Sequence, residues 1–376
     1  MGALERDLYT FGGVGGGENM KVLVLGAGNV GSAAAYDLSG EFDVWVGDVS
    51  EERLKAVEGF ANTVKVDVTD FQGLVETMDK FDLVASAVPG RFGFSVLKAG
   101  VEAGVDVVDV SFMPEDPWEL HDEAESRGVA LVVDAGFAPG LSHMFLGDIY
   151  SRMDELDEGI IRVGGLPKEP RGPLFYRITW SPYDLIEEYR RPARLIRGGR
   201  IVEVDPLSEI TPVELRGFEF EEFPSDGLRT ALRTIKAERL EERTLRWRGH
   251  LEKMKVLREL GFFDEENVDF TLRVIGPLMR YESPDFSIMQ VLGRGVRNGK
   301  AVEIEYFLYD EEREFTSMAR VTGFTLAQVV RLAAERKCTV GVIPPELIGM
   351  RGDAFALVLR GLKKRGILIE RRERGL

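Results

Sequence analysis

The stretch that decides the fold is Val22-Leu23-Val24-Leu25-Gly26-Ala27-Gly28-Asn29-Val30-Gly31. Its apolar run stops at a glycine and continues in a helical pattern, which predicts a buried strand, a tight turn and a helix that begins near Asn29. In such a loop Gly26 permits the turn, Gly28 lets a pyrophosphate approach the backbone, and Gly31 allows close packing of the helix on the strand. The free N–H groups at the helix start attract phosphate. The loop therefore predicts a bound dinucleotide; a glycine-rich turn that binds nothing is the alternative.

An acidic residue in the next strand indicates which dinucleotide the loop binds. The apolar run from Phe42 to Gly47 ends in Asp48, about twenty residues after Gly28, where a carboxylate accepts hydrogen bonds from the ribose hydroxyls. A 2′-phosphate would be repelled there and would need a nearby arginine, whereas Arg53 comes only on the next helix. We therefore expect NAD rather than NADP as the cofactor.

Composition excludes several classes of protein. The chain has 376 residues, 44% hydrophobic and 30% charged, with a net charge of −16 and one cysteine. We expect a soluble protein without a membrane span, and the negative charge argues against nucleic acid or an anionic membrane as a partner. The single Cys338 excludes an intramolecular disulfide and a multi-cysteine metal site, so we expect a buried thiol and a reducing, cytoplasmic location. The abundance of Glu, Lys and Arg is typical of thermophilic proteins.

Four segments are expected along the chain. Residues 1–19 include Gly12, Gly13 and Gly15–Gly17 and lack the features of a signal peptide, so they are interpreted as a flexible leader. Residues 20–142 alternate apolar strands with helical patterns, which predicts an α/β domain with a parallel, Rossmann-type sheet. Residues 143–323 predict a second, α+β domain with a mixed, mostly antiparallel sheet. Residues 324–376 are expected to return and pack on the first domain.

Some elements of the second domain have clear local signals. Arg297-Asn298-Gly299-Lys300 and Arg197-Gly198-Gly199-Arg200 predict two-residue hairpin turns. Strand-like runs lie around 160–163, 201–204, 270–274 and 288–291, and residues 226–262 form a charged stretch that we interpret as helical.

Ligands of parallel sheets bind beyond the carboxyl ends of the strands. The residues at these ends are Asp67, Ala87-Val88-Pro89, Asp109 with Ser111, and Asp134. We expect Asp67 near the adenine and the run 87–89 near the nicotinamide half, with Asp109 and Ser111 also at the cofactor. Asp109 and Asp134 are candidates to accept a proton or hold an amine. Each of these acids has a second interpretation as the cap of the next segment.

The remaining polar candidates are histidines and arginines. His143 stands at the expected start of the helix that crosses between the domains, His250 lies in the second domain, and His121 is interpreted as solvated. Three scattered histidines disfavour a metal site, and no nucleophile elbow or P-loop lysine is present. Arg177, which is near Trp180, has aromatic neighbours, and so has Arg246. Such surroundings suit a bidentate ion pair with a carboxylate of the substrate. Surface ion pairs are the alternative.

Several of these motifs together resemble those of the saccharopine dehydrogenase-like family. In the first domain they are Gly26–Gly31, Asp48, Ala87–Pro89, Val108–Ser111 and Gly136–Gly140 with His143-Met144. In the second domain they are Thr179-Trp180-Ser181, Glu188-Tyr189, Pro192-Ala193, and Thr244-Leu245-Arg246 with Gly249-His250. The resemblance covers the chain from Met20 onward, and the most similar branch is that of the L-lysine 6-dehydrogenases.

The resemblance implies a Rossmann domain, an inserted substrate domain and a homodimer formed through the latter. It also implies that L-lysine and NAD give 2-aminoadipate 6-semialdehyde, which cyclises, with NADH and ammonia. The ε-amine has a pKa of about 10.4 in water and must lose a proton before it reacts. The candidates to accept this proton are Asp109 and Asp134, with His250 as a second choice. The candidates to bind the substrate are Arg177, Trp180 and Arg246. The alternatives are a saccharopine or carboxynorspermidine dehydrogenase acting on a secondary amine, and a non-catalytic NAD sensor.

Overall fold

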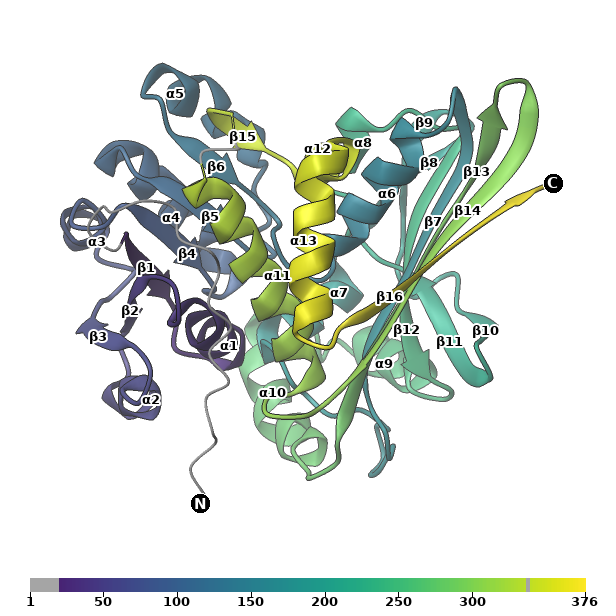
Figure 1. The fold of residues 1–376 in the computed structure, drawn as a ribbon. Helices are drawn as coiled ribbons and strands as arrows, with labels where there is room; N and C mark the ends of the chain where they lie inside the picture. Colours follow the sequence, from purple (N-terminus) through teal and green to yellow (C-terminus); the bar gives the residue numbers. More distant parts are fainter. Residues whose placement is uncertain (1–19, 336–338) are drawn as a thin grey trace.

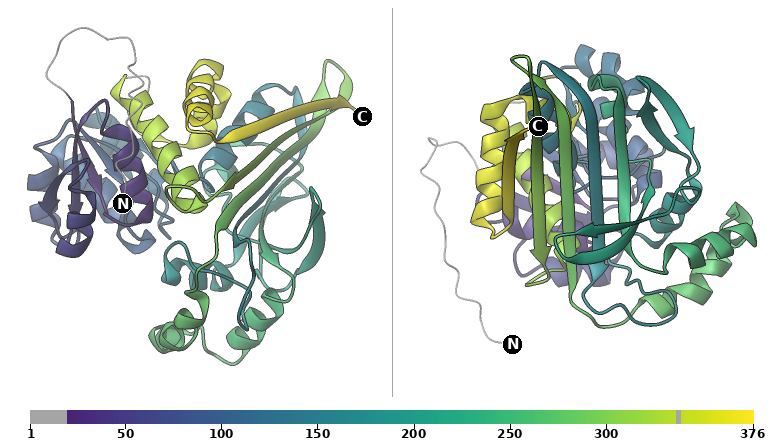
Figure 2. Two further views of the ribbon diagram at one scale, coloured as in Figure 1. Left: turned by 60° about the horizontal axis from the view of Figure 1, so that its bottom comes forward. Right: turned by 90° about the vertical axis from the view of Figure 1, so that its right-hand side faces the viewer.

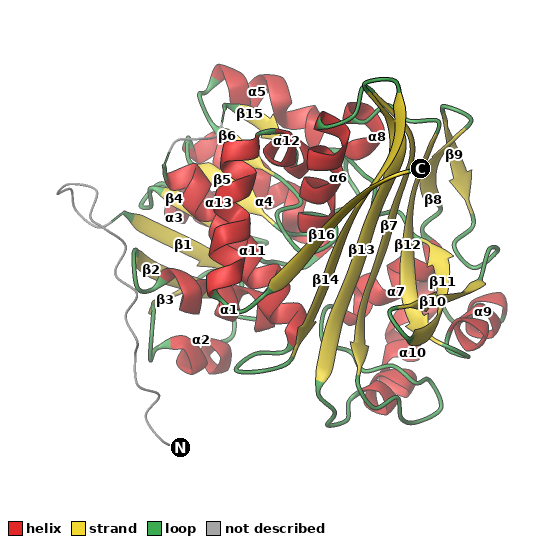
Figure 3. Cartoon of the chain, turned by 45° about the vertical axis from the view of Figure 1, so that its right-hand side comes forward, coloured by secondary structure: helices red, strands yellow, loops and turns green. Residues whose placement is uncertain are grey.

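The computed structural model describes residues 20–335 and 339–376, so the expected leader and Cys338 lie outside the described residues. The chain forms two sheets, with the helices α6 (Leu141–Ser151), α11 (Ser317–Ala334) and α13 (Gly352–Lys364) between them (Figures 1 and 3). None of the helices in the described ranges is long and apolar enough to cross a membrane.

The first sheet is parallel throughout, as predicted. Its order within the described chain is β15-β6-β5-β4-β1-β2-β3. The strands are β1 (Lys21–Leu25), β2 (Asp43–Asp48), β3 (Asn62–Lys65), β4 (Leu83–Ser86), β5 (Asp106–Asp109), β6 (Ala130–Val132) and β15 (Gly341–Ile343). The helices of this domain are α1 (Asn29–Leu38), α2 (Glu51–Val57), α3 (Phe71–Met78), α4 (Gly90–Ala103), η1 (Pro117–Leu120) and α5 (His121–Ser126). The strand order reverses between β1 and β4, and sheets of this kind bind ligands in the crevice beyond the carboxyl ends of the two strands.

The second sheet is mixed, also as predicted, and Figure 2 (right) shows it face on with the first domain behind. Its order is β10-β11-β12-β7-β13-β14-β16, with β8 beside β12 and β9 beside β8; β12 and β7 are parallel and the other pairs antiparallel. The strands are β7 (Glu155–Pro167), β8 (Ala193–Arg197), β9 (Arg200–Val204), β10 (Thr211–Leu215), β11 (Phe218–Pro224), β12 (Arg239–Trp247), β13 (Asp285–Arg297), β14 (Lys300–Glu311) and β16 (Leu368–Gly375). Both predicted hairpins are present, and Asn298 and Gly299 have φ values of 52° and 70°.

Two assignments from the sequence are wrong. Residues 270–274 belong to a helix, α10 (Val268–Ile275), because Val268, Thr271 and Ile275 are buried at helical spacing while Phe270 and Val274 face solvent. The stretch 226–262 contains the central strand β12 between the helices α8 (Ala231–Thr234) and α9 (Leu251–Glu259). Its charged residues concealed a strand, since they form ion pairs with neighbouring strands instead of facing water.

The C-terminal segment contributes to both domains. Helix α11 packs against α1 so closely that a Cβ on Gly323 would lie 2.7 Å from the carbonyl oxygen of Val30. After it, β15 pairs with β6 in the first sheet, whereas β16 pairs with β14 in the second. The expected return to the first domain therefore describes α11 and β15, and the last strand goes to the edge of the other sheet.

The helices α6 and α12 (Pro345–Met350) cross at two glycines. A Cβ on Gly147 would overlap the carbonyl oxygen of Glu346, and a Cβ on Gly349 would overlap that of Met144. This reciprocal backbone contact joins the helix that leaves the first domain to the segment that returns to it.

Gly349→Ala is therefore expected to lower the free energy of unfolding by about 1–3 kcal/mol, because the added methyl group forces α6 and α12 apart. Urea denaturation followed by circular dichroism measures this loss. Gly352→Ala is the matched control, since no described atom lies within 4 Å of its added Cβ, and its stability should change by less than about 0.5 kcal/mol. Equal stability of the two variants would contradict the close crossing.

Candidate active site

Each glycine of the loop after β1 has a distinct geometry. Gly26 has a φ of 99°, and a Cβ there would lie 2.6 Å from the carbonyl oxygen of Ala87. A Cβ on Gly31 would overlap the carbonyl oxygen of Gly26. A Cβ on Gly28, in contrast, would have no described atom within 4 Å. The turn and the helix packing thus require two of the glycines, and the third faces open space.

The start of α1 fits the phosphates of a dinucleotide. Gly28 is the N-cap residue and provides no side-chain acceptor, and the first turn contains no acidic residue. The N–H groups of the first turn are therefore left for a ligand, and the helix dipole favours a negative charge at this position. Ala87 lies against the glycine loop, since its carbonyl oxygen is 2.6 Å from where a Cβ on Gly26 would be, and Pro89 is the N-cap residue of α4.

Asp48 and Asp67 have different surroundings. The Asp48 carboxylate accepts hydrogen bonds from the N–H groups of Ala27 and Ser50, both at 2.8 Å, and Arg53 lies 3.7 Å away. Each of its oxygens has a further lone pair that a ribose hydroxyl can use. Asp67 is exposed and accepts from the backbone and hydroxyl of Thr69, a turn-capping arrangement.

Asp109 lies at the end of β5, buried beside Ser111. Its Oδ2 accepts hydrogen bonds from the N–H and the hydroxyl of Ser111, at 2.9 and 2.6 Å. Oδ1 accepts no hydrogen bond of normal geometry from the described residues, although the hydroxyl of Ser86 on β4 is close enough to favour the carboxylate form. Burial raises the pKa of Asp109 to about 6. This carboxyl group therefore combines a free acceptor atom with a pKa near neutrality, as a general base requires.

Asp134 is held by an arginine of the second domain. Arg229 donates from Nε to its carboxylate at 2.8 Å and from Nη1 to the carbonyl oxygen of Met113 at 2.5 Å. Both charged side chains are buried. Asp134 is thus ion-paired where Asp109 is not. Arg229 is 95 residues away along the chain, and no sequence motif pointed to it.

His250 does not fit the role of a base. Its Nδ1 donates to the carbonyl oxygen of Leu174 at 2.6 Å, so its Nε2 accepts from the Tyr189 hydroxyl at 2.8 Å. The ring is fully buried, and burial beside Arg246 lowers the pKa of His250 to about 3. With its lone pair occupied, His250 supports the packing of the second domain.

The three predicted substrate residues form contacts within the chain. The guanidinium group of Arg177 pairs with Glu312 at 2.9 Å, which argues against the predicted ion pair between Arg177 and a substrate carboxylate. Arg246 is buried, pairs with Glu188 and donates to the Tyr189 hydroxyl at 2.9 Å. Trp180 donates from Nε1 to the Tyr176 hydroxyl at 2.8 Å. Arg246 lies over the Tyr176 ring at 4.8 Å, so Arg246 and Trp180 belong to one wall of side chains.

The other two histidines join elements of the fold. His143 is fully buried, with Nε2 bonded to the carbonyl oxygen of Leu228 and Nδ1 3.0 Å from the Ser142 hydroxyl. His121 accepts a hydrogen bond from the N–H of Val342 in β15. The interpretation of His121 as a solvated side chain is therefore wrong, because β15 comes from the far end of the chain.

Two charged side chains that sequence reasoning missed lie at the domain boundary. Glu242 on β12 is 4% exposed; its Oε1 accepts from the Ser225 hydroxyl at 3.3 Å and its Oε2 has no partner among the described residues. The guanidinium group of Arg191 lies over the ring of Phe112 at 4.4 Å. Its Nη1 is buried and donates no hydrogen bond to any described residue. Burial and the carboxylates of three residues raise the pKa of Glu242 to about 8; they are Glu188, Asp226 and Asp134.

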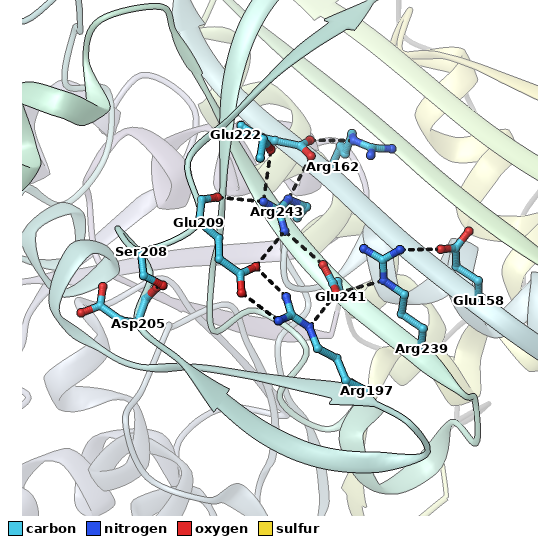
Figure 4. A network of polar contacts seen from close by, with 11 residues as sticks. Glu158, Arg162, Arg197, Asp205, Ser208, Glu209, Glu222, Arg239, Glu241 and Arg243 are labelled. Carbon is cyan, nitrogen blue, oxygen red and sulfur yellow. Dashed lines mark hydrogen bonds and ion pairs between the residues drawn. The ribbon is translucent and has the colours of Figure 1, made fainter.

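A groove of about 900 Å³ lies on the face of β12 opposite to Glu242, and Figure 4 shows the ion pairs formed by its lining residues. Arginines and glutamates line it in alternation. Each of its four arginines contacts a carboxylate: Arg162 and Arg243 contact Glu222, Arg197 contacts Glu209, and Arg239 contacts Glu158, at distances of 2.7–2.9 Å. Since these charges are balanced within the chain, the groove is a weaker candidate for the active site than the crevice.

Replacing Gly28 should separate cofactor binding from folding. In Gly28→Ser the hydroxyl can cap α1 and occupy the N–H groups that a phosphate would use, so dinucleotide affinity should fall at least about tenfold without loss of stability. Gly31→Ala should instead lower the free energy of unfolding by about 1–3 kcal/mol. Calorimetric titration with NADH and urea denaturation measure the two effects. Unchanged affinity in Gly28→Ser would contradict the phosphate site.

The raised pKa of Glu242 predicts how stability depends on pH. The folded chain keeps this proton up to a pH of about 8, whereas the unfolded chain loses it near the model value of 4.5, so stability falls as the pH rises between these values. Glu242→Gln removes this loss. Its free energy of unfolding should lie within about 1 kcal/mol of the wild type at pH 5 and exceed it at pH 9 by on the order of 4 kcal/mol, at about 1.36 kcal/mol per pKa unit.

Glu241→Gln is the control for this measurement. Glu241 lies on the other face of β12, and the neighbouring guanidinium groups of Arg239 and Arg197 lower its pKa to about 2. Its stabilising effect is fully present above the unfolded value of 4.5, so the variant should be less stable than the wild type at both pH values. Urea denaturation at pH 5 and pH 9 measures both variants. A constant difference between Glu242→Gln and the wild type would contradict the raised pKa.

Comparisons with known proteins agree with this architecture. The family model described as Saccharopine dehydrogenase NADP binding domain matches residues 22–132, and the one described as Saccharopine dehydrogenase C-terminal domain matches residues 136–367. A solved structure of apo saccharopine dehydrogenase (L-Glu forming) from Saccharomyces cerevisiae superposes with a TM-score of 0.77 at 20% identity, over 94% of this chain and 100% of that one. This likeness shows the fold.

Curated relatives have related names. The alpha-aminoadipic semialdehyde synthase of Arabidopsis thaliana is 27% identical over 65% of this chain, and a saccharopine dehydrogenase [NADP(+), L-glutamate-forming] of Pyricularia oryzae is 25% identical over 60% of it. The matches span 27% and 53% of those two proteins. The carboxynorspermidine synthase of Vibrio cholerae is 23% identical over 77% of this chain and 81% of its own length. With both of its domains matched by the family models, the chain belongs to the saccharopine dehydrogenase family of oxidoreductases.

Proposed function

We propose that this protein is an NAD-dependent dehydrogenase that removes the ε-amine of L-lysine. The products are 2-aminoadipate 6-semialdehyde, which cyclises, together with NADH and ammonia. The observation that carries this proposal is Oδ1 of Asp109, a buried carboxyl oxygen at the end of β5 that accepts no hydrogen bond of normal geometry from the described residues and has the Ser86 hydroxyl as its neighbour. Such a group, in the crevice that also contains the glycine loop, suits proton abstraction from a substrate beside a dinucleotide.

The residues of the loop fit the proposed cofactor. The phosphates would lie at the open space before Gly28 and at the first turn of α1, and the adenosine ribose would lie at Asp48. The matched family model is described as NADP binding, and Arg53 stands 3.7 Å from Asp48. We nevertheless favour NAD, because the Asp48 carboxylate would repel a 2′-phosphate and Arg53 is largely exposed, with 63% of its side-chain surface open to solvent. When bound, the nicotinamide ring accepts a hydride from the carbon that bears the amine.

The proposed chemistry assigns a role to each side of the crevice. An ε-ammonium group has a pKa of about 10.4 in water, and its nitrogen must be neutral before the adjacent carbon can release a hydride. Asp109 accepts the proton through Oδ1, and burial away from water also disfavours the charged amine. Water then adds to the resulting imine and ammonia leaves. Asp134, which the ion pair with Arg229 keeps occupied, holds the second domain against this edge of the sheet.

The distribution of arginines favours lysine over saccharopine. Saccharopine has three carboxylates, whereas lysine has one. Of the arginines that the structure places at the domain boundary, Arg177, Arg194, Arg229 and Arg246 each contact a carboxylate of the chain. Arg191, which is half-buried, and Arg91, which is exposed at the start of α4, have no such contact with a described residue. A single half-buried guanidinium group without a carboxylate suits a substrate with one carboxylate. Carboxynorspermidine metabolism is the second candidate, because the Vibrio cholerae relative matches over most of its length.

An absorbance assay at 340 nm tests the proposal. Purified protein with NAD and lysine at pH 9–10 should produce NADH, and it should do so faster than with NADP or with saccharopine. Asp109→Asn should lower kcat by about 10²–10⁴-fold, the usual range for loss of a general base, while its affinity for NADH stays within about threefold of the wild type. The Gly31→Ala variant serves as a control for nonspecific loss of stability.

Three outcomes would reject parts of the proposal. Absence of NADH formation with lysine would reject the lysine dehydrogenase activity, and faster turnover of saccharopine or carboxynorspermidine would replace it with the alternative. A preference for NADP would reject the assignment made from Asp48. Wild-type activity in Asp109→Asn would remove Asp109 from the reaction.

A further inference from the structure

A group of buried and half-buried charges lies where the second domain meets the strand ends of the first. In the described part of the chain it includes the carboxylates of Asp134, Glu188, Asp226 and Glu242 and the guanidinium groups of Arg191, Arg194, Arg229 and Arg246. Three pairs are formed: Arg229 with Asp134, Arg194 with Asp226, and Arg246 with Glu188. One carboxylate, Glu242, and one guanidinium group, Arg191, are left without an opposite charge in contact.

Glu242 is enclosed by the chain but not neutralised by it. The loop after β11 passes over its carboxylate so closely that a Cβ on Gly227 would overlap it. The Ser225 hydroxyl is the one hydrogen-bond donor that the described residues supply, and Glu188, Asp226 and Asp134 face it with charges of the same sign. A buried carboxylate in such surroundings is unfavourable until a cation arrives.

Arg191 is placed by a helix end and an aromatic ring. It follows α7 (Pro182–Arg190) directly, and Pro192 prevents the helix from continuing. Its guanidinium group lies on Phe112, the residue after Ser111, so it is tied to the loop that also positions Asp109. The acids that face it are already engaged, as the following contacts show: Asp226 pairs with Arg194, Glu187 pairs with Arg190, and Asp184 is near Ser181 and Gly90.

We propose that Glu242 and Arg191 bind the α-amino acid end of the substrate, with the α-ammonium group on Glu242 and the α-carboxylate on Arg191. This inference rests on the proposed function and identifies the residues that would select for an amino acid. An α-amino acid presents one cation and one anion on a single carbon atom, which matches the one free carboxylate and one free guanidinium group. The reacting ε-amine would then extend toward Asp109.

This arrangement would make selectivity depend on both charges. An amine without the α-carboxylate would leave Arg191 unpaired, and one without the α-ammonium group would leave Glu242 unpaired. Sites that hold a polar group of the substrate reject analogues lacking that group strongly, because the protein group is left buried without a partner. Cadaverine lacks the carboxylate of lysine, and 6-aminohexanoate lacks its α-amine, so the two analogues test the two contacts separately.

Isothermal titration calorimetry on the protein saturated with NADH, which cannot oxidise lysine, tests the assignment. The wild type should bind lysine at least tenfold more tightly than cadaverine or 6-aminohexanoate. In Glu242→Gln the preference for lysine over 6-aminohexanoate should fall below about threefold, while the preference over cadaverine remains. In Arg191→Gln the pattern should reverse, with the preference over cadaverine lost.

Neighbouring residues supply matched controls. Glu241→Gln removes a carboxylate from the opposite face of β12, and Arg190→Gln removes a guanidinium group that pairs with Glu187. Both should keep the selectivity of the wild type. Thermal melting followed by circular dichroism confirms that each variant is folded before the titrations are compared.

The outcomes separate this inference from the proposed function. Lysine binding with unchanged selectivity in Glu242→Gln and Arg191→Gln would overturn the inference alone. An equal loss of affinity for all three amines in Glu242→Gln would also overturn it, since that result would place Glu242 at the amine that the three ligands share. Failure of lysine to bind the wild-type complex would reject the proposed function and the inference together.

Discussion

A charge buried away from water needs a partner, and this requirement organises the boundary between the two domains. The ion pair of Arg229 and Asp134 joins a loop of the second domain to the end of β6, and both side chains are almost fully buried. Removing one partner of such a pair typically costs about 3–5 kcal/mol. Because the neighbouring charges are paired in the same way, Glu242 and Arg191 stand out as the exceptions, and the proposed recognition of an amino acid follows from them.

Close backbone contacts hold the crevice at this boundary. Gly323 lets α11 approach α1, and Gly147 and Gly349 let α6 and α12 cross without intervening side chains. The elements that carry the candidate site are thus fixed to a rigid central layer of helices (Figure 3). Such support suits a site in which a carbon atom and a nicotinamide ring must be oriented with little error.

The two domains divide the proposed tasks. The first supplies the phosphate-binding loop, Asp48 and the carboxyl group of Asp109, all at the ends of parallel strands. The second supplies Glu242 from β12 and Arg191 from the end of α7. Arg246, a predicted substrate-binding residue, and His250, a secondary candidate for the base, have another use: with Tyr189 they form a hydrogen-bonded chain that ends at the carbonyl oxygen of Leu174. That chain gives the wall of the second domain its shape.

The sequence by itself determined the parts that depend on local spacing: the glycine loop, the parallel sheet of the first domain, the hairpin at Asn298-Gly299 and the family. These follow from backbone conformation and from periodic burial, which a short window of residues contains. Tertiary structure alone decided that β12 is a strand, that Arg177 and His250 are occupied, and that Glu242 and Arg191 are free. The reason is that a charged side chain has the same appearance in sequence whether or not it is paired, and its partner here stands 58 to 135 residues away, as for Arg246 with Glu188 and Arg177 with Glu312.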